Sequence, residues 1–369
     1  MVFLSGSIVE LCKQAPAIAV VLILAAACCA MGQSVVIRDA QGMVFGPYTD
    51  SNSPAHWDGD TLYILNSNDY PVRSFGPDQF HWGEPQDAKS NTPRPCWIEA
   101  TWKTDDGALY GWYHHEPRPL CAGTDLSAPK IGAARSTDNG LNWTDLGIVL
   151  EAPAGTIDCS YANGFFAGGH GDFSGILDRE GKYYYIFYSN YAGDVSRQGV
   201  AVARMAWKDR DNPRGKFRKY CQGKWLQPGI GGHSTPFFPT KISWKEEKVD
   251  SFWGPSIHWN TYLEKYVILL NRAVGGPEWP QEGIYITFGT DLADPKSWTE
   301  PKKIVDGDWY PQVLGLDTKA KETDKLCGRV GRLYMHGISR KEIVFLRDGD
   351  DPTKLPPVYR FRKPKTTSP

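Results

Sequence analysis

The stretch Asp172-Phe-Ser-Gly-Ile-Leu-Asp-Arg-Glu-Gly-Lys-Tyr-Tyr-Tyr-Ile-Phe-Tyr-Ser189 points most directly to the fold. It predicts a β-hairpin in which a short apolar strand, 174–177, precedes a tight turn, 178–181. A strand rich in aromatic and β-branched residues, 183–188, follows the turn. Asp172 stands just ahead of the first strand, behind the glycine-rich run 168–171. If such hairpins repeat around a ring, acids in this position gather at its mouth.

The same hairpin recurs four more times along the chain. A tyrosine marks the same place in its second strand each time, namely Tyr63, Tyr110, Tyr184, Tyr266 and Tyr334. The second and fourth copies are each followed by a third strand, a turn opened by Thr-Asp, a tryptophan and a fourth strand. Five units of four strands predict an all-β fold, a five-bladed β-propeller with four antiparallel strands per blade. A two-sheet sandwich is the alternative, but it leaves the recurring four-strand unit unexplained.

One segment supports a propeller blade independently. Ser136-Thr-Asp-Asn-Gly-Leu-Asn-Trp143 matches the Asp-box pattern Ser-x-Asp-x-Gly-x-x-Trp in full. The physics of this pattern is structural, because the aspartate binds turn amides, the glycine takes a positive φ and the tryptophan packs between strands. The segment therefore indicates a blade and says little about activity.

Composition restricts the partners. The 369 residues carry a formal net charge of −1, so no global field attracts nucleic acid or an anionic membrane. Aromatic residues reach 13%. Most of them are explained by the core of an all-β fold, but aromatic surfaces also suit carbohydrate. We expect a monomer that binds a carbohydrate substrate, with neither nucleic acid nor, once the leader is removed, membrane as a partner.

The chain begins with a leader. Residues 17–31 are apolar apart from two cysteines, and Ala30-Met-Gly32 offers small residues at a cleavage position. We expect a signal peptide over 1–32, one propeller domain over 33–362, a disordered tail over 363–369, and a secreted or periplasmic protein. A retained anchor is less favoured, because the run is shorter than the roughly 20 residues of a spanning helix. A lipid anchor on Cys28 or Cys29 is also disfavoured.

Five cysteines follow the leader: Cys96, Cys121, Cys159, Cys221 and Cys327. Since five is odd, at least one is unpaired unless a second chain supplies a partner. One or two disulfides fit an exported protein. The sequence contains no Cys-x-x-Cys spacing, so a zinc site is not expected.

In a propeller, the start of each innermost strand points into one mouth of the central channel. Asp50 and Asp172 each lie nine residues before a turn glycine, and Glu99 lies eight before another. Trp253 holds the comparable place in the fourth unit. Asp58 and Asp78 compete with Asp50 for the first position.

With these motifs the chain resembles, over roughly residues 50–305, the five-bladed propeller glycoside hydrolases of families 43, 32 and 117. In family 43 the first blade carries an Asp base, the third an Asp that orients the acid, and the fourth a Glu acid before Gly-Pro. The resemblance implies that Asp50 is the base or nucleophile and Asp172 the orienting carboxylate. Trp253-Gly-Pro255 departs from the pattern, because tryptophan replaces the acid.

Another residue must then donate the proton. We favour Glu99, which tryptophans flank in Cys96-Trp-Ile-Glu-Ala-Thr-Trp102, because burial against aromatic rings raises a carboxyl pKa towards that of a general acid. Glu116, beside two histidines, is the alternative. A carboxylate that only caps a loop or pairs with an arginine would explain Glu99 equally well.

The remaining site candidates are expected to bind substrate: His170, His114, His115, Trp253, Arg272 and Trp112. No pair of histidines has the helical spacing of metal ligands, so no metal site is predicted. Some family 43 relatives hold an ion on the propeller axis, so the resemblance allows a structural calcium ion there. No other cofactor is expected.

The sequence therefore predicts a secreted glycoside hydrolase that acts on an arabinan-, xylan- or galactan-like saccharide with paired carboxylates. Trp253 in the acid's place favours a different class, a non-catalytic carbohydrate-binding propeller. A sialidase-like hydrolase would need an arginine triad and usually several Asp boxes, but the sequence shows no clear triad and one full Asp box. A propeller polysaccharide lyase, using tyrosine and histidine, is the last alternative.

Overall fold

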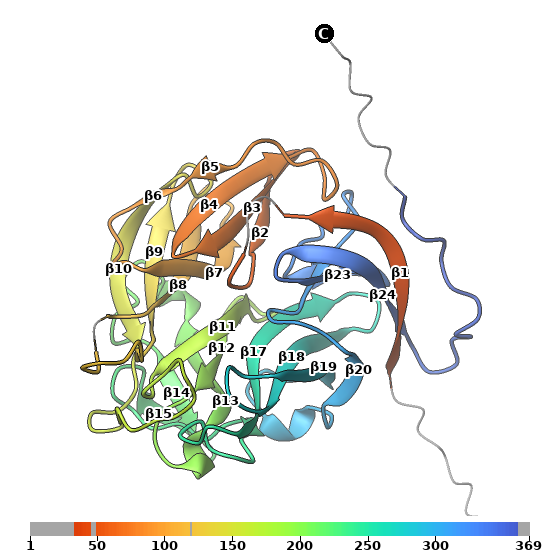
Figure 1. Ribbon diagram of the computed structural model, residues 1–369. Helices are drawn as coiled ribbons and strands as arrows, with labels where there is room; N and C mark the ends of the chain where they lie inside the picture. The colour runs from red at the N-terminus through yellow and green to blue at the C-terminus, as the bar shows by residue number, and fades with distance from the viewer. Residues whose placement is uncertain (1–32, 46–48, 119, 361–369) are drawn as a thin grey trace, which may run out of the picture.

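The computed structural model describes residues 33–45, 49–118 and 120–360, and its sheets form a ring around a central axis (Figure 1). The expected leader and the whole of the expected tail lie outside these residues. Five mostly antiparallel sheets of four to six strands make up the described part. The predicted five-bladed β-propeller is therefore confirmed, with three short 3-10 segments and no α-helix among the described residues.

The blades follow one another in chain order. The first contains β2 (Ala55–Asp58), β3 (Thr61–Asn68), β4 (Tyr70–Gly76) and β5 (Gln86–Asp87). The second contains β7 (Cys96–Lys103), β8 (Leu109–His115), β9 (Lys130–Ser136) and β10 (Asn142–Leu150), with the short β6 (Lys89–Ser90) at its outer edge. The third contains β11 (His170–Leu177), β12 (Tyr183–Asn190), β13 (Gly199–Ala206), β14 (Arg218–Cys221) and β15 (Lys224–Pro228), with β16 (Phe238–Pro239) paired to β13.

The last two blades bring distant parts of the chain together. The fourth contains β17 (Val249–Asn260), β18 (Lys265–Gly275), β19 (Gln281–Gly289) and β20 (Lys302–Val305), and β22 (Leu326–Cys327) adds to its inner edge. The fifth contains β21 (Gln312–Gly315), β23 (Val330–Met335), β24 (Ile338–Leu346) and the early strand β1 (Ser34–Val44). β1 pairs antiparallel with β24, so a strand from the start of the described chain completes the last blade. This pairing closes the ring without a covalent link.

The five marker tyrosines occupy equivalent strands, as the repeat predicted. They lie on β3, β8, β12, β18 and β23, the second strand of each blade. In the third blade the predicted turn is formed by a hydrogen bond from the Gly181 amide to the Asp178 carbonyl, with φ of +69° at Gly181. The first strand of this hairpin, however, begins at His170 rather than near residue 174. Asp172 therefore lies inside the strand and not ahead of it.

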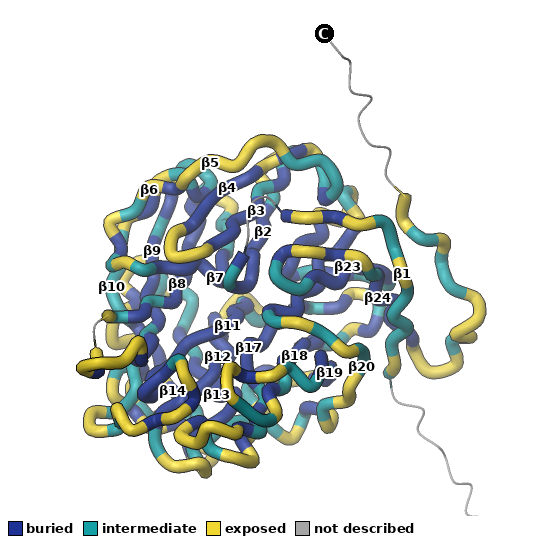
Figure 2. Tube along the Cα trace, viewed as in Figure 1, coloured by how far each residue is buried: buried dark blue, intermediate teal, exposed yellow. Residues whose placement is uncertain are grey.

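The core lies between neighbouring blades. Figure 2 shows that the buried residues lie mainly along the strands and the exposed ones mainly in the loops. Between the second and third blades, Trp112 stacks on Tyr184 with ring centroids 3.7 Å apart. Such flat contacts between wide sheets explain why an aromatic-rich sequence suits this fold. No helix among the described residues is long and apolar enough to cross a membrane.

Polar contacts between blades cross the axis of the ring. The Asn52 amide donates to the carbonyls of Phe173 and Pro255, both at 2.9 Å. Closer to the other end of the inner strands, the Lys325 ammonium lies 3.1 Å from the Ser174 hydroxyl. These contacts tie the first, third and fourth blades together and separate the two mouths of the channel.

One disulfide joins Cys121 to Cys159, with Cα atoms 5.6 Å apart. It ties the β8–β9 loop of the second blade to the segment between β10 and β11, which leads into the third blade. Cys96, Cys221 and Cys327 are buried thiols. The cysteine count allowed one or two disulfides, and the described residues contain one.

Candidate active site

The inner strands of three blades each contain a β-bulge, which turns side chains towards the same mouth of the channel. The pairing register shifts at Glu99 in β7, at Asp172 in β11 and at Gly254-Pro255 in β17. Asp172 has φ of +39°, an uncommon conformation for a residue with a side chain. Bulges and strained backbone often mark functional sites, where they redirect a side chain. Here they turn two carboxylates towards the axis.

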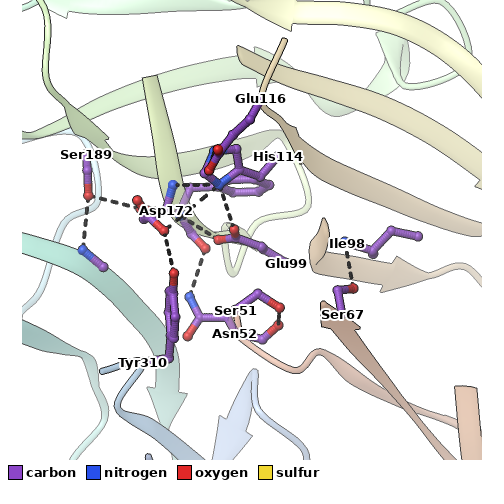
Figure 3. A network of polar contacts seen from close by, with 12 residues as sticks. Ser51, Asn52, Ser67, Ile98, Glu99, His114, Glu116, Asp172, Ser189 and Tyr310 are labelled. Atoms are coloured by element: carbon purple, nitrogen blue, oxygen red, sulfur yellow. Dashed lines mark hydrogen bonds and ion pairs between the residues drawn. The ribbon is translucent and has the colours of Figure 1, made fainter. Parts of the chain in front are cut away.

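His114 lies at the centre of the resulting cluster (Figure 3). Its Nδ1 is 3.1 Å from Glu99 Oε1 and 3.9 Å from Asp172 Oδ1, and its Nε2 is 3.5 Å from Glu116 Oε1. Glycine at position 171 makes room for the ring, because a Cβ there would lie 2.7 Å from His114 Cε1. The second and third blades therefore supply three carboxylates around one imidazole.

Both oxygens of Asp172 accept hydrogen bonds from tyrosines. The Tyr310 hydroxyl donates to Oδ1 at 3.1 Å, and the Tyr191 hydroxyl donates to Oδ2. The oxygens of Glu99 are also engaged, since Oε1 faces His114 and Oε2 accepts the Phe173 amide at 2.7 Å. Every carboxylate oxygen of this pair thus has a defined partner.

Burial and mutual charge shift the proton affinities of the cluster. Burial raises the pKa of Asp172 to about 6, and the Glu99 charge adds to this rise while His114 opposes it. Burial also raises the pKa of Glu99, although its hydrogen bond with His114 opposes the shift. Burial acts to lower the pKa of His114, but the Glu99 hydrogen bond and the charge of Asp172 outweigh it and raise that pKa to about 9. Near neutral pH the imidazole is therefore a cation.

Asp50 adds a fourth carboxylate from the first blade. Its side chain is half-buried, whereas Glu99 and Asp172 are 1% and 3% exposed. Burial raises the pKa of Asp50 to about 6, and the charge of Asp172 adds to the shift. Among the expected catalytic carboxyls, Asp50 is therefore the one that solvent reaches.

The two competitors of Asp50 lie elsewhere. Asp58 ends β2, at the opposite end of the inner strand, and contacts Lys103 and Asn139. Asp78 accepts hydrogen bonds from the Phe80 amide and contacts the His81 ring at 2.8 Å. Asp50 is thus the aspartate of the first unit that shares an electrostatic environment with Asp172 and His114.

The cluster has the composition of a metal site, but the oxygens of its two central carboxylates are already engaged. One ligand atom from each of Glu99, His114 and Asp172 lies within 4.8 Å of the others. Calcium prefers six to eight oxygen ligands, a set that this group with its imidazole does not provide. The carboxylate oxygens already accept hydrogen bonds, and the imidazole is protonated near neutral pH. The arrangement is that of a proton-sharing group.

Trp253, which replaces the expected acid, is completely buried and packs beside the cluster. Its ring contacts Trp279, Trp309 and Tyr310 edge to face, with centroids 5.1 to 5.6 Å apart. This placement corrects the expectation that Trp253 binds substrate, because it presents no free face. Trp309 is half-buried in the same aromatic group and does present surface.

Several other predicted substrate-binding residues point away from the mouth. His170 is completely buried, and its Nε2 lies 2.9 Å from the Lys219 ammonium. His115 contacts the Pro95 carbonyl through Nδ1, and Arg272 pairs with Asp250 at 3.0 Å. Trp112 is 1% exposed within the core. Of the predicted substrate-binding residues, the structure brings only His114 into the cluster.

Sequence reasoning missed the groups that hold Asp172. Tyr191 follows the second strand of the third blade, where its residue type gives no distinguishing signal among 18 tyrosines. Tyr310 precedes β21 and has φ of +55°, which local sequence does not announce. The repeat does offer a weak signal, because Tyr310 comes just before the inner strand of the fifth blade, where Asp50 stands in the first. No residue of the fifth blade was predicted to face the mouth.

Comparison with solved structures identifies the architecture. An α-L-arabinanase from Cellvibrio cellulosa, complexed with arabinohexaose, matches with a TM-score of 0.50 and 14% identity, over 82% of this chain and 94% of that one. An endo-arabinase from Bacteroides thetaiotaomicron matches with a TM-score of 0.48 and 14% identity, over 84% and 100%. An exo-β-1,3-galactanase from Phanerochaete chrysosporium matches with a TM-score of 0.45 and 12% identity, over 84% and 64%.

No profile of a known protein family matches the sequence, and no curated protein sequence matches it significantly. At the identities above, the structural matches establish the fold alone. The expected resemblance to the five-bladed propeller glycoside hydrolases of family 43 is thus confirmed as a distant structural similarity.

Proposed function

We propose that this protein is a glycoside hydrolase that cleaves an oligosaccharide or polysaccharide of the arabinan, xylan or galactan type. The observation that carries the proposal is the convergence of Asp50, Glu99 and Asp172 on one mouth of the propeller. Burial raises the pKa of each of these carboxyls. Glycoside hydrolysis needs one protonated and one ionised carboxyl group, and burial, which raises the pKa of Asp50 and Asp172 to about 6 and that of Glu99 above its usual value, favours such a mixture.

Asp50 is the base or nucleophile in this proposal, because it has surface that a substrate or water can reach. Glu99 delivers the proton: burial raises its pKa, and the protonated His114 ring, 3.1 Å away, supplies the proton that Glu99 passes on. Asp172 and His114 position and tune Glu99 through the contacts described above. In the base role, Asp50 accepts one proton from the attacking water for each proton that Glu99 delivers, and release of that proton to solvent with reprotonation of the His114–Glu99 pair restores the cluster. Trp309 offers a half-buried ring on which a sugar can stack.

The replacement of the fourth-blade acid by Trp253 favours a second candidate function. Glu99 is 1% exposed, so a substrate oxygen reaches it only if neighbouring side chains yield. A non-catalytic propeller that binds carbohydrate at this mouth needs no such access. The two functions differ in one measurable property, the release of reducing ends.

Export of the protein is part of the proposal. The disulfide between Cys121 and Cys159 supports it, because disulfides persist mainly in oxidising compartments. The expected leader over residues 1–32 supplies the signal. We therefore place the enzyme outside the cytoplasm, where polymeric saccharides occur.

A reducing-sugar screen on arabinan, xylan, galactan and bacterial glycans tests the proposal. The wild type should release reducing ends from at least one polymer, and Glu99→Gln should abolish the release. Asp78→Asn is the matched control, because its carboxylate lies outside the cluster, and it should retain full activity. Binding of a polymer without any release by the wild type would support the carbohydrate-binding alternative instead.

A further inference from the structure

The opposite mouth of the channel holds a cavity of about 460 Å³. It is lined by the last residues of the inner strands β2, β7, β11 and β17, and by the segment that leads into β22. Its volume falls in the range of small-molecule sites, which is roughly 300 to 1,000 Å³. Asn52 and Lys325 bridge the blades between this cavity and the carboxylate cluster. The cavity is therefore separate from the site described above.

Three tryptophans form the apolar part of its wall. Trp57, Trp102 and Trp259 each lie one residue before the end of an inner strand, and all three are half-buried rather than sealed in the core. Their positions on three different blades surround the cavity with ring surface. Aromatic walls that stay open to solvent suit the apolar faces of a ring-shaped ligand, whose burial contributes about 25 cal/mol per Å².

A buried polar group in the wall lacks a partner. Thr101 is 2% exposed and lines the cavity, and its hydroxyl makes no hydrogen bond within the described residues. A buried polar group without a partner costs about 1–3 kcal/mol, so most such groups in native proteins are paired. Beside it, burial and the charge of Lys103 lower the pKa of His56 to about 3, which leaves a neutral imidazole in the wall. Both groups suit a ligand that carries hydroxyls.

Among the described residues, one of the cations around the cavity makes no ion pair, and the one carboxylate in the lining, Asp178, is engaged by the amides of Lys182 and Tyr183. Lys103, Lys321 and Lys325 contact carboxylates of neighbouring residues, at 3.5, 2.9 and 2.9 Å. Arg179 is exposed and makes no ion pair with any residue that the structure describes. Its guanidinium lies 5.0 Å from the centre of the Trp259 ring, over one of the aromatic walls. A planar guanidinium in this position is suited to a carboxylate.

We propose that this second mouth binds an acidic sugar of the uronate type. The sugar ring packs on the tryptophan walls, its hydroxyls bond to Thr101 and His56, and its carboxylate pairs with Arg179. This assignment does not rest on hydrolytic activity, because it needs only binding. It gives the propeller two carbohydrate sites, one at each end of the axis.

Isothermal titration calorimetry with α-1,4-linked digalacturonate and with neutral galactobiose tests the assignment. Wild type and Asp50→Asn should bind digalacturonate equally, because Asp50 lies at the other mouth. Arg179→Gln should weaken digalacturonate binding about tenfold, equivalent to 1.4 kcal/mol, and leave galactobiose binding unchanged. Thr101→Val, which keeps the side-chain shape, should weaken the binding of both sugars. Lys182→Gln removes a neighbouring exposed cation outside the cavity and should change nothing.

Four results would overturn the assignment. The first is that the wild type does not bind digalacturonate. The second is that binding survives both Arg179→Gln and Thr101→Val, with melting temperatures showing that each variant is folded. The third is that Asp50→Asn abolishes binding, which would place the sugar at the carboxylate cluster. Equal affinity for the neutral disaccharide would remove the role of Arg179 and with it the acidic specificity.

Discussion

The Tyr310 hydroxyl donates a hydrogen bond to Asp172 Oδ1 at 3.1 Å, although the two residues lie 138 positions apart in the chain. Tyr191 donates to the other oxygen of the same carboxylate. The third and fifth blades thus hold one buried aspartate between two phenols. Asp172 can keep its orientation at a bulge with positive φ because it is fixed from both sides.

Removing one phenol should change the proton affinity of Asp172. The hydrogen bond from Tyr191 stabilises the ionised carboxylate and so lowers its pKa. Tyr191→Phe should therefore raise that pKa further, by about one unit if the bond contributes about 1.5 kcal/mol. The acidic limb of the pH profile of kcat/KM should move to higher pH. Tyr161→Phe, whose hydroxyl contacts Gln198 instead, is the control and should leave the profile in place.

Asp50 should destabilise the folded protein above pH 6. Its pKa rises from 3.8 to about 6 on folding, so the folded state keeps a proton that the unfolded chain has lost. The stability contributed by this proton is fully present below pH 4 and is lost as the pH rises through 6. Asp50→Asn should raise the free energy of unfolding by about 1–2 kcal/mol at pH 7.5 and leave it nearly unchanged at pH 4. Urea unfolding at both pH values measures the difference.

Asp58→Asn is the control of opposite sign. Hydrogen bonding to Asn139 lowers the pKa of Asp58, so the ionised form contributes stability at neutral pH that is lost as the pH falls through this lowered pKa. The substitution should lower stability at pH 7.5 and have less effect in acid. If both variants shift stability in the same direction at pH 7.5, the burial argument for Asp50 is wrong.

The disulfide should stabilise the β8–β9 loop of the second blade and the segment that leads into the third blade. Cys121 and Cys159 are 38 residues apart, and closing a loop of this size contributes about 3–4 kcal/mol in the chain-entropy account. The double variant Cys121→Ser and Cys159→Ser should melt several degrees lower than the wild type. Dithiothreitol should lower the melting temperature of the wild type towards that value and not affect the variant. A wild type insensitive to reduction would contradict this account.

Trp309 should contribute to substrate affinity more than to turnover. Its ring is half-buried beside Trp253 and presents surface near the mouth. Trp309→Ala should raise KM about tenfold, equivalent to 1.4 kcal/mol, and change kcat by less than about threefold. Trp225→Ala removes a half-buried tryptophan from an outer strand and should change neither constant. An unchanged KM in Trp309→Ala would remove this ring from the binding surface.

The fold was readable because its information is local and repeated. Each blade has a hairpin whose turn glycine and second-strand tyrosine recur, so the five units could be aligned within one sequence. The pairing of β1 with β24 was not predicted, because it joins segments about 300 residues apart that carry no complementary motif. Likewise, the start of β11 was placed too late, since this strand is buried along nearly its whole length and so lacks an alternating pattern, and a bulge interrupts its pairing at Asp172.

The candidate site was readable only in part. Position within the repeat placed Glu99 and Asp172 at one mouth, and the structure brings them together around His114. The other positions depend on burial. Trp112 and Trp253 were predicted to bind substrate, but both fill the interior of the ring. Whether an aromatic side chain packs on a neighbouring blade or faces solvent depends on tertiary contacts that single-sequence patterns do not contain.

Chemical rescue of Asp50→Ala on an activated aryl glycoside tests the central claim most directly. If Asp50 acts as base or nucleophile, the variant should lose at least about a hundredfold in kcat. Added formate, a small carboxylate that can occupy the vacated space, should restore part of this activity, whereas Asp78→Ala should need no rescue. Full activity of Asp50→Ala without formate would contradict the account.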